Sequence, residues 1–435
     1  MEPIIVIGAG LAGCEAAWQI AKRGGKVHLY EMKPKAYSPA HRSPFFAELV
    51  CSNSFKSESL ENASGILKEE MKRLDSLILR IAKEAKVPAG DSLAVDREVF
   101  SKQITQELES LENVEVVREE VCSIPQNGIA IIATGPLTSD ILSKEIQKVT
   151  GIRHLSFYDA ISPIVTAESV NFQKAFKSSR YGKGGEDYVN CPMDEKSYTQ
   201  FVEALNQAEK VSVQPFEKRY LFEGCLPIEE MAGRGRETLA FGPLKPVGLI
   251  DPKTGKQPFA VVQLRQEDRF ETLFNLVGFQ TRLKYGEQER IFRMIPGLER
   301  AEFVRLGSIH RNTFIDSPRL LGESLQLKTR ANLFFAGQIT GVEGYMESTA
   351  IGLLSGINAR RYAIGLPGVV PPATTAMGAL VHYITHSQNV PFQPMNINFG
   401  LFPPLSGKSR GRGKRLLMGK RALKEMEEWK KKNEI

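Results

Sequence analysis

The stretch IIVIGAGLAGCEAAWQIAKRGGKVHLYEM, residues 4–32, decides the fold of this chain. Its apolar start, residues 4–7, is typical of a strand buried on both faces of a parallel sheet. Gly8, Gly10 and Gly13 follow in the pattern GxGxxG. The first glycine allows a tight turn, the second lets the backbone approach a pyrophosphate, and the third lets a helix pack closely on the strand. The sequence therefore predicts a strand, a glycine turn and a helix that together bind a dinucleotide.

The residues after the glycines complete this unit. A helix from Cys14 ends at a Gly-Gly pair. A strand over 26–30 then ends at Glu31, 23 residues after Gly8, where an acid accepts hydrogen bonds from a ribose. The free N–H groups at the helix start favour the pyrophosphate. The predicted dinucleotide-binding residues here are Gly8, Ala9, Gly10, Leu11, Ala12, Gly13 and Glu31.

Two later segments favour FAD over NAD. Residues 129–136, IAIIATGP, predict a short buried strand, and residues 332–349, NLFFAGQITGVEGYMEST, predict a strand, a glycine-rich turn and a helix. Such pairs resemble the two-dinucleotide-fold flavoproteins, in which the late segment lies along the FAD. No second GxGxxG with a terminal acid marks a separate NAD(P)H domain. The resemblance adds Thr134, Gly135, Gly337, Gln338 and Gly341 to the cofactor-binding residues.

The predicted fold class is α/β, a Rossmann-like FAD-binding domain of the two-dinucleotide-fold flavoprotein type with an inserted α+β domain. We expect the FAD-binding domain over 1–153 and 311–406, the inserted substrate or RNA domain over 154–310, and a basic helix or tail over 407–435. Within the first part, apolar spacing predicts one long amphipathic helix from Ser64 to Ala85. A second helix is predicted to begin after the N-cap residue Asp96.

Composition and charge narrow the function class. The chain of 435 residues is 42% hydrophobic and 25% charged, which is ordinary globular composition. No apolar run approaches the ~18 residues of a membrane span, and five scattered cysteines argue against a disulfide framework, so we expect a cytoplasmic protein. The net charge of +7 lies entirely in the tail from Lys408, with 11 basic and 4 acidic residues. Such a tail indicates either nucleic-acid binding or a solvated helix.

Two cysteines lie in unusual surroundings. Cys225 lies in FEGCLPIEEM, and Cys51 precedes a Ser-Asn-Ser cluster that is typical of turns and helix caps. A thiol at a helix N-terminus or beside arginines has a lowered pKa. Each cysteine taken alone is more often a small buried hydrophobe, and this is the interpretation kept for Cys14, Cys122 and Cys191.

A third segment, GSIHRNTFIDSP over 307–318, predicts a polar exposed loop. The imidazole of His310 can stack on a heterocycle, and the guanidinium of Arg311 can hold a carboxylate. A structural role for an isolated histidine remains the alternative.

Five strings carry a specific resemblance. HRSPFFAELVCSNSFKS, EGCLPIEEMAGRGRETLAFGPLKPVGL, NLVGFQTRLKYGEQERIFRMIPGLE, GSIHRNTFIDSP and LFFAGQITGVEGYMES follow one another along the chain. Together they resemble the folate- and FAD-dependent tRNA (uracil-54-C5-)-methyltransferases. The departures are Asp316 where many members have asparagine, Met346 where they have valine, and a tail unusually rich in Gly, Lys and Arg over 407–415.

The resemblance implies transfer of a one-carbon unit from 5,10-methylenetetrahydrofolate, by way of N5 of reduced FAD, to C5 of uridine 54 in the tRNA T-loop. NADH or NADPH then restores the reduced flavin. By resemblance, Cys225 adds to uracil C6 and makes C5 nucleophilic. Cys51 removes the C5 proton or guards the nucleophile, and Tyr345 acts on the proton or the substrate. His310 and Arg311 then hold the folate.

RNA contacts are less sharply indicated. The tail and the cations Arg282, Lys284, Arg290 and Arg293 are candidates for phosphate contacts, although 282–293 is equally typical of an ordinary charged helix face. Glu229 and Glu230 either orient a base edge or are solvated acids. The implied partners are the T-arm of tRNA and folate, without a membrane or an obligatory protein partner.

Other function classes remain open at this point. The same chemistry could act on ribosomal RNA. The related flavoprotein that modifies wobble uridines needs a longer C-terminal helical domain. A small-molecule FAD/NAD(P)H oxidoreductase would leave the basic tail and the surroundings of Cys225 unexplained. A flavin-binding RNA chaperone without chemistry would keep its function after Cys225→Ala.

Overall fold

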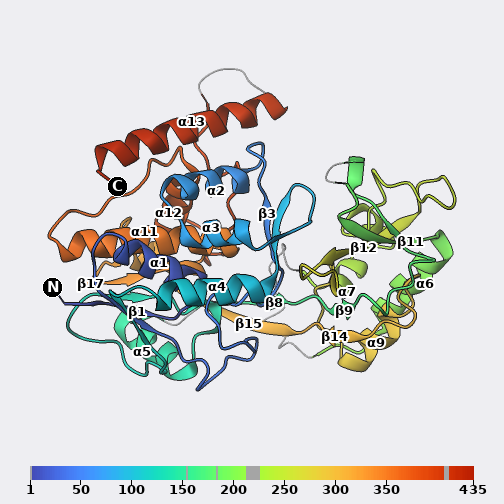
Figure 1. Ribbon diagram of the computed structural model, residues 1–435, viewed down its shortest axis with the longest axis horizontal. Helices are drawn as coiled ribbons and strands as arrows, with labels where there is room; N and C mark the ends of the chain where they lie inside the picture. Colours follow the sequence, from blue (N-terminus) through green and yellow to red (C-terminus); the bar gives the residue numbers. More distant parts are fainter. Residues whose placement is uncertain (1, 153–154, 183–184, 212–225, 406–410) are drawn as a thin grey trace.

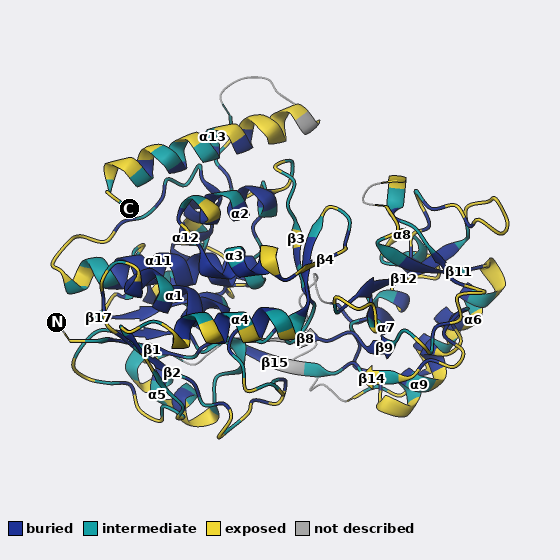
Figure 2. Cartoon of the chain, viewed as in Figure 1, coloured by how far each residue is buried: buried dark blue, intermediate teal, exposed yellow. Residues whose placement is uncertain are grey.

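The computed structural model describes residues 2–152, 155–182, 185–211, 226–405 and 411–435, without the side chains of 157–159, 310, 311 and 412. Figure 1 shows two bodies joined by a two-stranded ribbon. The ribbon pairs β8 (Leu155–Ala160) with β15 (Ile309–Phe314) in antiparallel register. Each body has its own buried apolar core, seen as dark blue segments inside both bodies (Figure 2).

The larger body is built on a six-stranded sheet of order β16-β17-β7-β1-β2-β6. All neighbouring strands are parallel except the edge pair of β16 and β17. The strands are β1 (Ile4–Ile7), β2 (Val27–Tyr30), β6 (Val114–Val117), β7 (Ala130–Ile132), β16 (Gln326–Leu327) and β17 (Arg330–Phe335). The central strand β1 is an apolar run, as parallel strands covered on both faces require.

Helices cover both faces of this sheet. Helix α1 (Leu11–Ala21) and helix α11 (Tyr345–Ala363) lie side by side on one face although they come from opposite ends of the sequence (Figure 1). Helix α5 (Asp140–Thr150) belongs to the smaller apolar cluster with β7 and β17. This layered arrangement confirms the predicted Rossmann-like α/β architecture.

The predicted helix over Ser64–Ala85 is wrong as a single element. The chain forms α2 (Ala63–Arg73) and α3 (Leu77–Glu84), with Asp75 in the left-handed region at φ 58°. Ser76 caps α3 by accepting a hydrogen bond from the backbone N–H of Leu79 at 3.2 Å. Its hydroxyl donates to Glu15 on α1 at 2.7 Å, so a buried polar contact fixes the break. The apolar periodicity continues across the break and hides it.

The smaller body contains a six-stranded sheet of order β10-β11-β12-β13-β9-β14. Its strands are β9 (Ile164–Thr166), β10 (Phe176–Lys177), β11 (Tyr188–Met193), β12 (Ala260–Gln266), β13 (Leu273–Leu276) and β14 (Phe303–Arg305). Its helices are α6 (Glu195–Gln207), α7 (Ile228–Ala232), α8 (Thr238–Phe241) and α9 (Tyr285–Phe292). The residues of strand β12 are buried throughout.

The remaining elements complete the larger body. A three-stranded sheet contains β3 (Ser54–Ser57), β5 (Ser92–Val95) and β4 (Lys86–Val87). The helices are α4 (Arg97–Glu109), α10 (Ser317–Leu320), α12 (Ala376–His386) and α13 (Gly411–Lys432). Short 3-10 turns lie at Gly135–Leu137 and Gly337–Thr340, and a third, Arg180–Gly182, lies between β10 and β11 of the smaller body. Asp96 caps α4 as predicted, by accepting from Glu98 and Val99.

The C-terminal helix α13 lies across α2 in Figure 1 and begins at Gly411, within the basic helix or tail expected over 407–435. None of the helices in the described ranges is long and apolar enough to cross a membrane.

Candidate functional site

The glycine turn has the shape that its sequence predicts. Gly8 has φ 101°, which strongly favours glycine. A Cβ on Gly13 would overlap the carbonyl oxygen of Gly8, so the third glycine lets α1 approach the strand. At Gly10, the N-cap of α1, no side chain caps the helix and a Cβ would meet nothing within 4 Å. The first N–H groups of α1 therefore face space that a ligand can fill.

An open cleft lies at this turn, with about 1100 Å³ of empty space that includes open solvent. Many predicted cofactor-binding residues line it: Gly8, Ala9, Gly10, Leu11, Ala12, Glu31, Thr134, Gly135 and Gln338. Gly13 lies behind the turn, and a Cβ on Gly337 would approach Ala12 to 2.6 Å. Gly341 lies against the ring of Phe392. Tyr345, predicted as catalytic, also lines the cleft.

Glu31 is buried and holds the glycine turn in shape. One carboxylate oxygen accepts from the N–H of Ala9 at 3.1 Å, and the other accepts from the N–H of Lys33 at 3.0 Å. A carboxylate has about four acceptor positions, so these two bonds leave capacity for a ribose hydroxyl. The fixed acid next to the helix N-terminus fits the pattern of a dinucleotide-binding unit.

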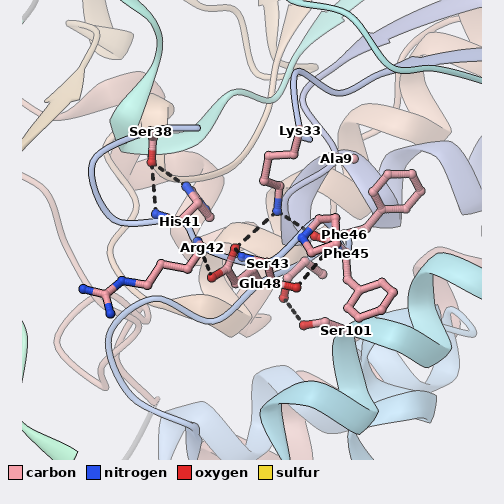
Figure 3. Close-up of polar contacts among 12 residues, drawn as sticks. Ala9, Lys33, Ser38, His41, Arg42, Ser43, Phe45, Phe46, Glu48 and Ser101 are labelled. Atoms are coloured by element: carbon pink, nitrogen blue, oxygen red, sulfur yellow. Dashed lines mark hydrogen bonds and ion pairs between the residues drawn. The ribbon is translucent and has the colours of Figure 1, made fainter. Parts of the chain in front are cut away.

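An ion pair that the sequence analysis missed also lines the cleft. Lys33 Nζ lies 3.4 Å from the Glu48 carboxylate and donates to the carbonyl of Phe45 at 2.6 Å (Figure 3). The same carboxylate accepts from the N–H groups of Arg42 and Ser43. The pair forms across a loop of irregular spacing, so neither periodicity nor a motif marks it in the sequence.

Three features of the cleft fit the parts of FAD. The cleft combines an uncapped helix N-terminus for a pyrophosphate, a buried acid for a ribose, and an open position at Gly10. In the described part of the chain no cluster of His, Cys, Asp and Glu has the arrangement of a metal site.

Cys51 lies beside Tyr345 at the edge of this cleft. The backbone N–H of Cys51 donates to the Tyr345 hydroxyl at 2.9 Å, which joins residues 294 positions apart. The Cys51 thiol lies 3.9 Å from the carbonyl oxygen of Ala160, at the end of β8. Of the two alternatives for the Ser-Asn-Ser cluster, the helix cap is wrong, because the chain bends at Cys51 and continues into strand β3. Positive charge near this thiol therefore comes from side chains and not from a helix N-terminus.

Arginines supply that charge. Arg97 donates to the carbonyl oxygens of Leu49 at 2.5 Å and of Cys51 at 3.0 Å. It also forms an ion pair with Glu267 of the smaller body, with Nε 2.5 Å from the carboxylate. Arg265 donates to Asn53 at 2.8 Å and to the Ser52 hydroxyl, so both bodies hold the Cys51 loop. Sequence reasoning missed these residues.

The other predicted catalytic and folate-binding residues are only partly described. Cys225, the expected nucleophile, lies outside the described residues. His310 and Arg311 lie in strand β15, which corrects the expected loop over 307–318, and their side chains are outside the described part.

The remaining cysteines differ from one another. Cys14 and Cys191 are fully buried, and burial raises the pKa of both thiols, to about 12 for Cys191. Both therefore fit the expected structural role. Cys122 is exposed, so its predicted burial is wrong: it follows β6 in an irregular surface segment.

The charged residues near Cys225 in sequence serve the fold. Glu229 is buried and accepts from the Thr281 hydroxyl and the Arg282 N–H, both at 2.8 Å. Burial raises the pKa of its carboxyl. Glu230 pairs with the Arg282 guanidinium. Neither acid is solvated and unpartnered, and Arg282 is already neutralised.

The cations on α9 and just before it are also paired. Lys284 contacts Glu209 at 2.5 Å, Arg290 contacts Glu287 at 2.6 Å, and Arg293 contacts Glu289 at 3.5 Å. This arrangement favours the interpretation of 282–293 as an ordinary charged helix face.

The fold and the cleft define a flavoprotein-type dinucleotide-binding protein with a second, mixed α+β body. The family described as "Glucose inhibited division protein A" matches residues 3–367. The structure of Aquifex aeolicus GidA in the form II crystal matches with a TM-score of 0.70 at 16% identity, over 98% of this chain and 73% of that chain. The form I crystal gives the same TM-score. At such low identity this likeness concerns the fold.

Closer relatives carry a more specific name. Proteins named "Methylenetetrahydrofolate--tRNA-(uracil-5-)-methyltransferase TrmFO" are 59% identical in Citrifermentans bemidjiense and 60% identical in Geotalea uraniireducens, over 98% of both chains in each case. The protein of that name from Desulfitobacterium hafniense is 58% identical over 99% of both chains. The chain therefore belongs to the TrmFO family.

Proposed function

We propose that this protein transfers a one-carbon unit from 5,10-methylenetetrahydrofolate to C5 of a tRNA uridine, giving 5-methyluridine, with NADH or NADPH as reductant. The target is uridine 54 of the T-loop. One observation carries the proposal: identity near 59% over 98% of both chains to relatives named for this reaction. The cleft and the residues around Cys51 supply compatible chemistry.

The cleft is the proposed FAD site. When bound, FAD supplies redox chemistry and a carrier for the one-carbon unit. The N–H groups at the start of α1 hold the pyrophosphate, and Glu31 accepts from a ribose hydroxyl. We assign Thr134, Gly135 and Gln338 to the same cofactor because they line the cleft.

We assign the two cysteines different steps in the reaction at the uracil base. Uracil C5 is a poor nucleophile until a thiolate adds to C6, and we assign this addition to Cys225. Cys51 and Tyr345 lie together, with the tyrosine hydroxyl 2.9 Å from the cysteine N–H, and we assign them to removal of the C5 proton. His310 and Arg311 remain the proposed folate contacts.

We propose that the body between the two ribbon strands, within the predicted domain 154–310, holds the RNA substrate, and that α13 contacts phosphates. Figure 2 shows buried and exposed residues alternating along α13. Met418, Ala422, Met426 and Trp429 are buried at helical spacing. The exposed residues of α13 include Lys414, Arg415, Lys420, Lys424 and Lys431. Such cations bind the phosphate backbone without reading sequence.

The test is methyl transfer to RNA. The purified protein with FAD is incubated with unmodified tRNA transcript, NAD(P)H and methylenetetrahydrofolate labelled in its methylene carbon. We expect label in 5-methyluridine of the T-loop, and none with Cys225→Ala. Label in ribosomal RNA but not tRNA would replace the proposed substrate. Transfer that survives Cys225→Ala would keep the reaction and remove the assigned nucleophile.

A further inference from the structure

The arginines around Cys51 differ in how many of their hydrogen-bond donors are already used. Arg97 uses all three of its guanidinium nitrogens, in four hydrogen bonds to Glu267 and to the carbonyl oxygens of Leu49 and Cys51. Arg265 is committed to Asn53 and Ser52. These two guanidiniums hold the Cys51 loop in place, so neither can turn to a ligand without releasing it.

Arg305 differs from both. It lies in β14, at the edge of the smaller body just before the ribbon strand β15. Its side chain is half-buried, and no residue in the described ranges accepts a hydrogen bond from its guanidinium or forms an ion pair with it. Arg305 pairs with Ile164 of β9, and four residues later Ile309 pairs with Ala160, whose carbonyl oxygen lies 3.9 Å from the Cys51 thiol. Burial lowers the pKa of Arg305, and Arg97, Tyr345 and Cys51 are among its electrostatic neighbours. A guanidinium has five donors, so those of Arg305 stay available to water or to a ligand.

The surroundings of Arg305 also carry surplus positive charge. Glu267 is the only described carboxylate in an ion pair with Arg97, Arg265 or Arg305. Arg42, from the same loop as Cys51, is exposed, and its side chain extends away from the Lys33–Glu48 pair (Figure 3). The cations around the Cys51 thiol therefore outnumber the acids that pair with them. An incoming anion would relieve this imbalance.

We propose that Arg305 binds a phosphodiester of the substrate RNA next to the target uridine, as a bidentate guanidinium–phosphate contact. The inference rests on the proposed function. Cys51 and Tyr345 act there on the base, so the nearest anions of the substrate are the phosphates on either side of that nucleotide. A base taken out of its stack needs its backbone held at the mouth of the site. Arginine matches phosphate geometry better than lysine does.

The test compares Arg305→Gln and Arg305→Lys with the full-length protein containing FAD. Arg300→Gln is the matched control, because Arg300 is exposed and lies five residues earlier. Initial rates of methyl transfer are measured against tRNA transcript, folate and KCl. For Arg305→Gln we expect a KM for RNA raised about tenfold, kcat and the folate KM unchanged within twofold, and a slope of log affinity against log salt reduced by about 1. Arg305→Lys should keep the salt slope but recover only part of the KM.

A modified substrate locates the contact. A T-arm hairpin with an uncharged methylphosphonate on the 5′ or 3′ side of the target uridine should raise the wild-type KM about tenfold at one of the two positions. The same methylphosphonate should not raise the KM of Arg305→Gln any further, because the substitution in the protein has already removed the contact that the modified phosphate would lose.

Four outcomes overturn the proposal. A raised folate KM with an unchanged RNA KM would assign Arg305 to the folate carboxylate. A lower kcat alone would assign it to charge developing on the uracil. Additive effects of protein and RNA changes, or no effect at all, would exclude the contact. Absence of transfer by the wild-type protein would instead contradict the proposed function, which separates the two failures. FAD content and thermal unfolding show whether each variant is folded. If Arg305→Gln fails to fold, the kinetic comparison is made with Arg305→Lys instead.

Discussion

The FAD cleft and the junction around Cys51 are adjacent but are built by different physical means. The cleft depends on backbone geometry: a left-handed glycine at position 8, close approach at Gly13, and an uncapped helix start. The junction depends on side-chain charge: Arg97 with Glu267, and Arg265 with Asn53. The first comes from one continuous stretch of chain, and the second joins residues 170 and 212 positions apart.

This difference predicts how each region responds to substitution. A backbone-built site fails when a side chain is added, because a packed turn cannot move aside. A charge-built junction fails when one partner is removed, because the other charge remains buried. The four predictions below test this contrast, from the largest expected effect to the smallest.

Gly13→Ala should have the largest effect. Its Cβ would overlap the Gly8 carbonyl oxygen, so the turn or α1 must shift. We expect a loss of about 4 kcal/mol of unfolding free energy and loss of FAD. Gly10→Ala is the matched control, because a Cβ there meets nothing within 4 Å and φ is −75°. Thermal unfolding should change by less than about 0.5 kcal/mol, with lower FAD content. Equal destabilisation by both substitutions would contradict a backbone-built cleft.

Glu267→Gln should be the next largest. It leaves the Arg97 guanidinium without its ion partner, where the two side chains are 18% and 3% exposed. We expect a loss of about 3 kcal/mol in denaturant unfolding. The double variant Arg97→Met with Glu267→Leu removes both charges and should be more stable than the sum of the single losses by at least about 1 kcal/mol. Strict additivity would mean that the pair does not join the two bodies energetically.

The same contrast explains which features could be predicted from the sequence. The unit β1–α1–β2 was predictable because each of its requirements lies within a few residues: the apolar run, the three glycines and Glu31. The Cys51–Tyr345 contact spans 294 positions, and no local pattern encodes it. Tyr345 entered the predicted site only through a family resemblance, and Cys51, although its Ser-Asn-Ser surroundings had marked it, received its role in the same way. Arg97, Arg265 and Arg305 share no motif with them.

The missed helix break shows a limit of periodicity. Apolar residues continue in helical phase from α2 into α3, so the pattern predicts one helix. The break is set by Asp75 at φ 58° and by the cap at Ser76. An Asp-Ser pair is a turn and N-cap signal, and it was available in the sequence. The buried hydrogen bond from Ser76 to Glu15 on α1, and the ion pair of the largely exposed Asp75 with Lys22 just after α1, favour the break over a continuous helix.

A third prediction concerns Glu70, a buried acid that is held by backbone N–H groups. Its buried carboxylate on α2 accepts from the N–H groups of Ala376 and Met377 at the start of α12, at 2.7 and 2.8 Å. Burial raises its pKa from 4.5 to about 8. Between these values the folded state holds a proton that the unfolded chain has lost, so stability falls as pH rises. The slope is about 1 kcal/mol per pH unit.

The measurement is the unfolding free energy at pH 6 and at pH 7, for the wild type and for Glu70→Gln. The wild type should lose about 1 kcal/mol more than the variant over this interval, because the amide does not titrate. Identical slopes would mean that the two N–H groups keep Glu70 ionised in the folded protein.

The smallest effect should come from Arg290→Ala on α9. Arg290 and Glu287 form an ion pair at 2.6 Å, in which the arginine side chain is 54% exposed and the glutamate side chain is 23% exposed. Water screens such a pair, so we expect a loss of about 0.3 kcal/mol and no change in the KM for tRNA. A cycle with Glu287→Ala isolates the coupling between the two side chains. A coupling above about 1 kcal/mol would show that exposed charge also stabilises this fold, and a raised KM would return α9 to the RNA surface. The expected null result would set this exposed pair apart from the buried Arg97–Glu267 pair, whose disruption is expected to cost about ten times as much.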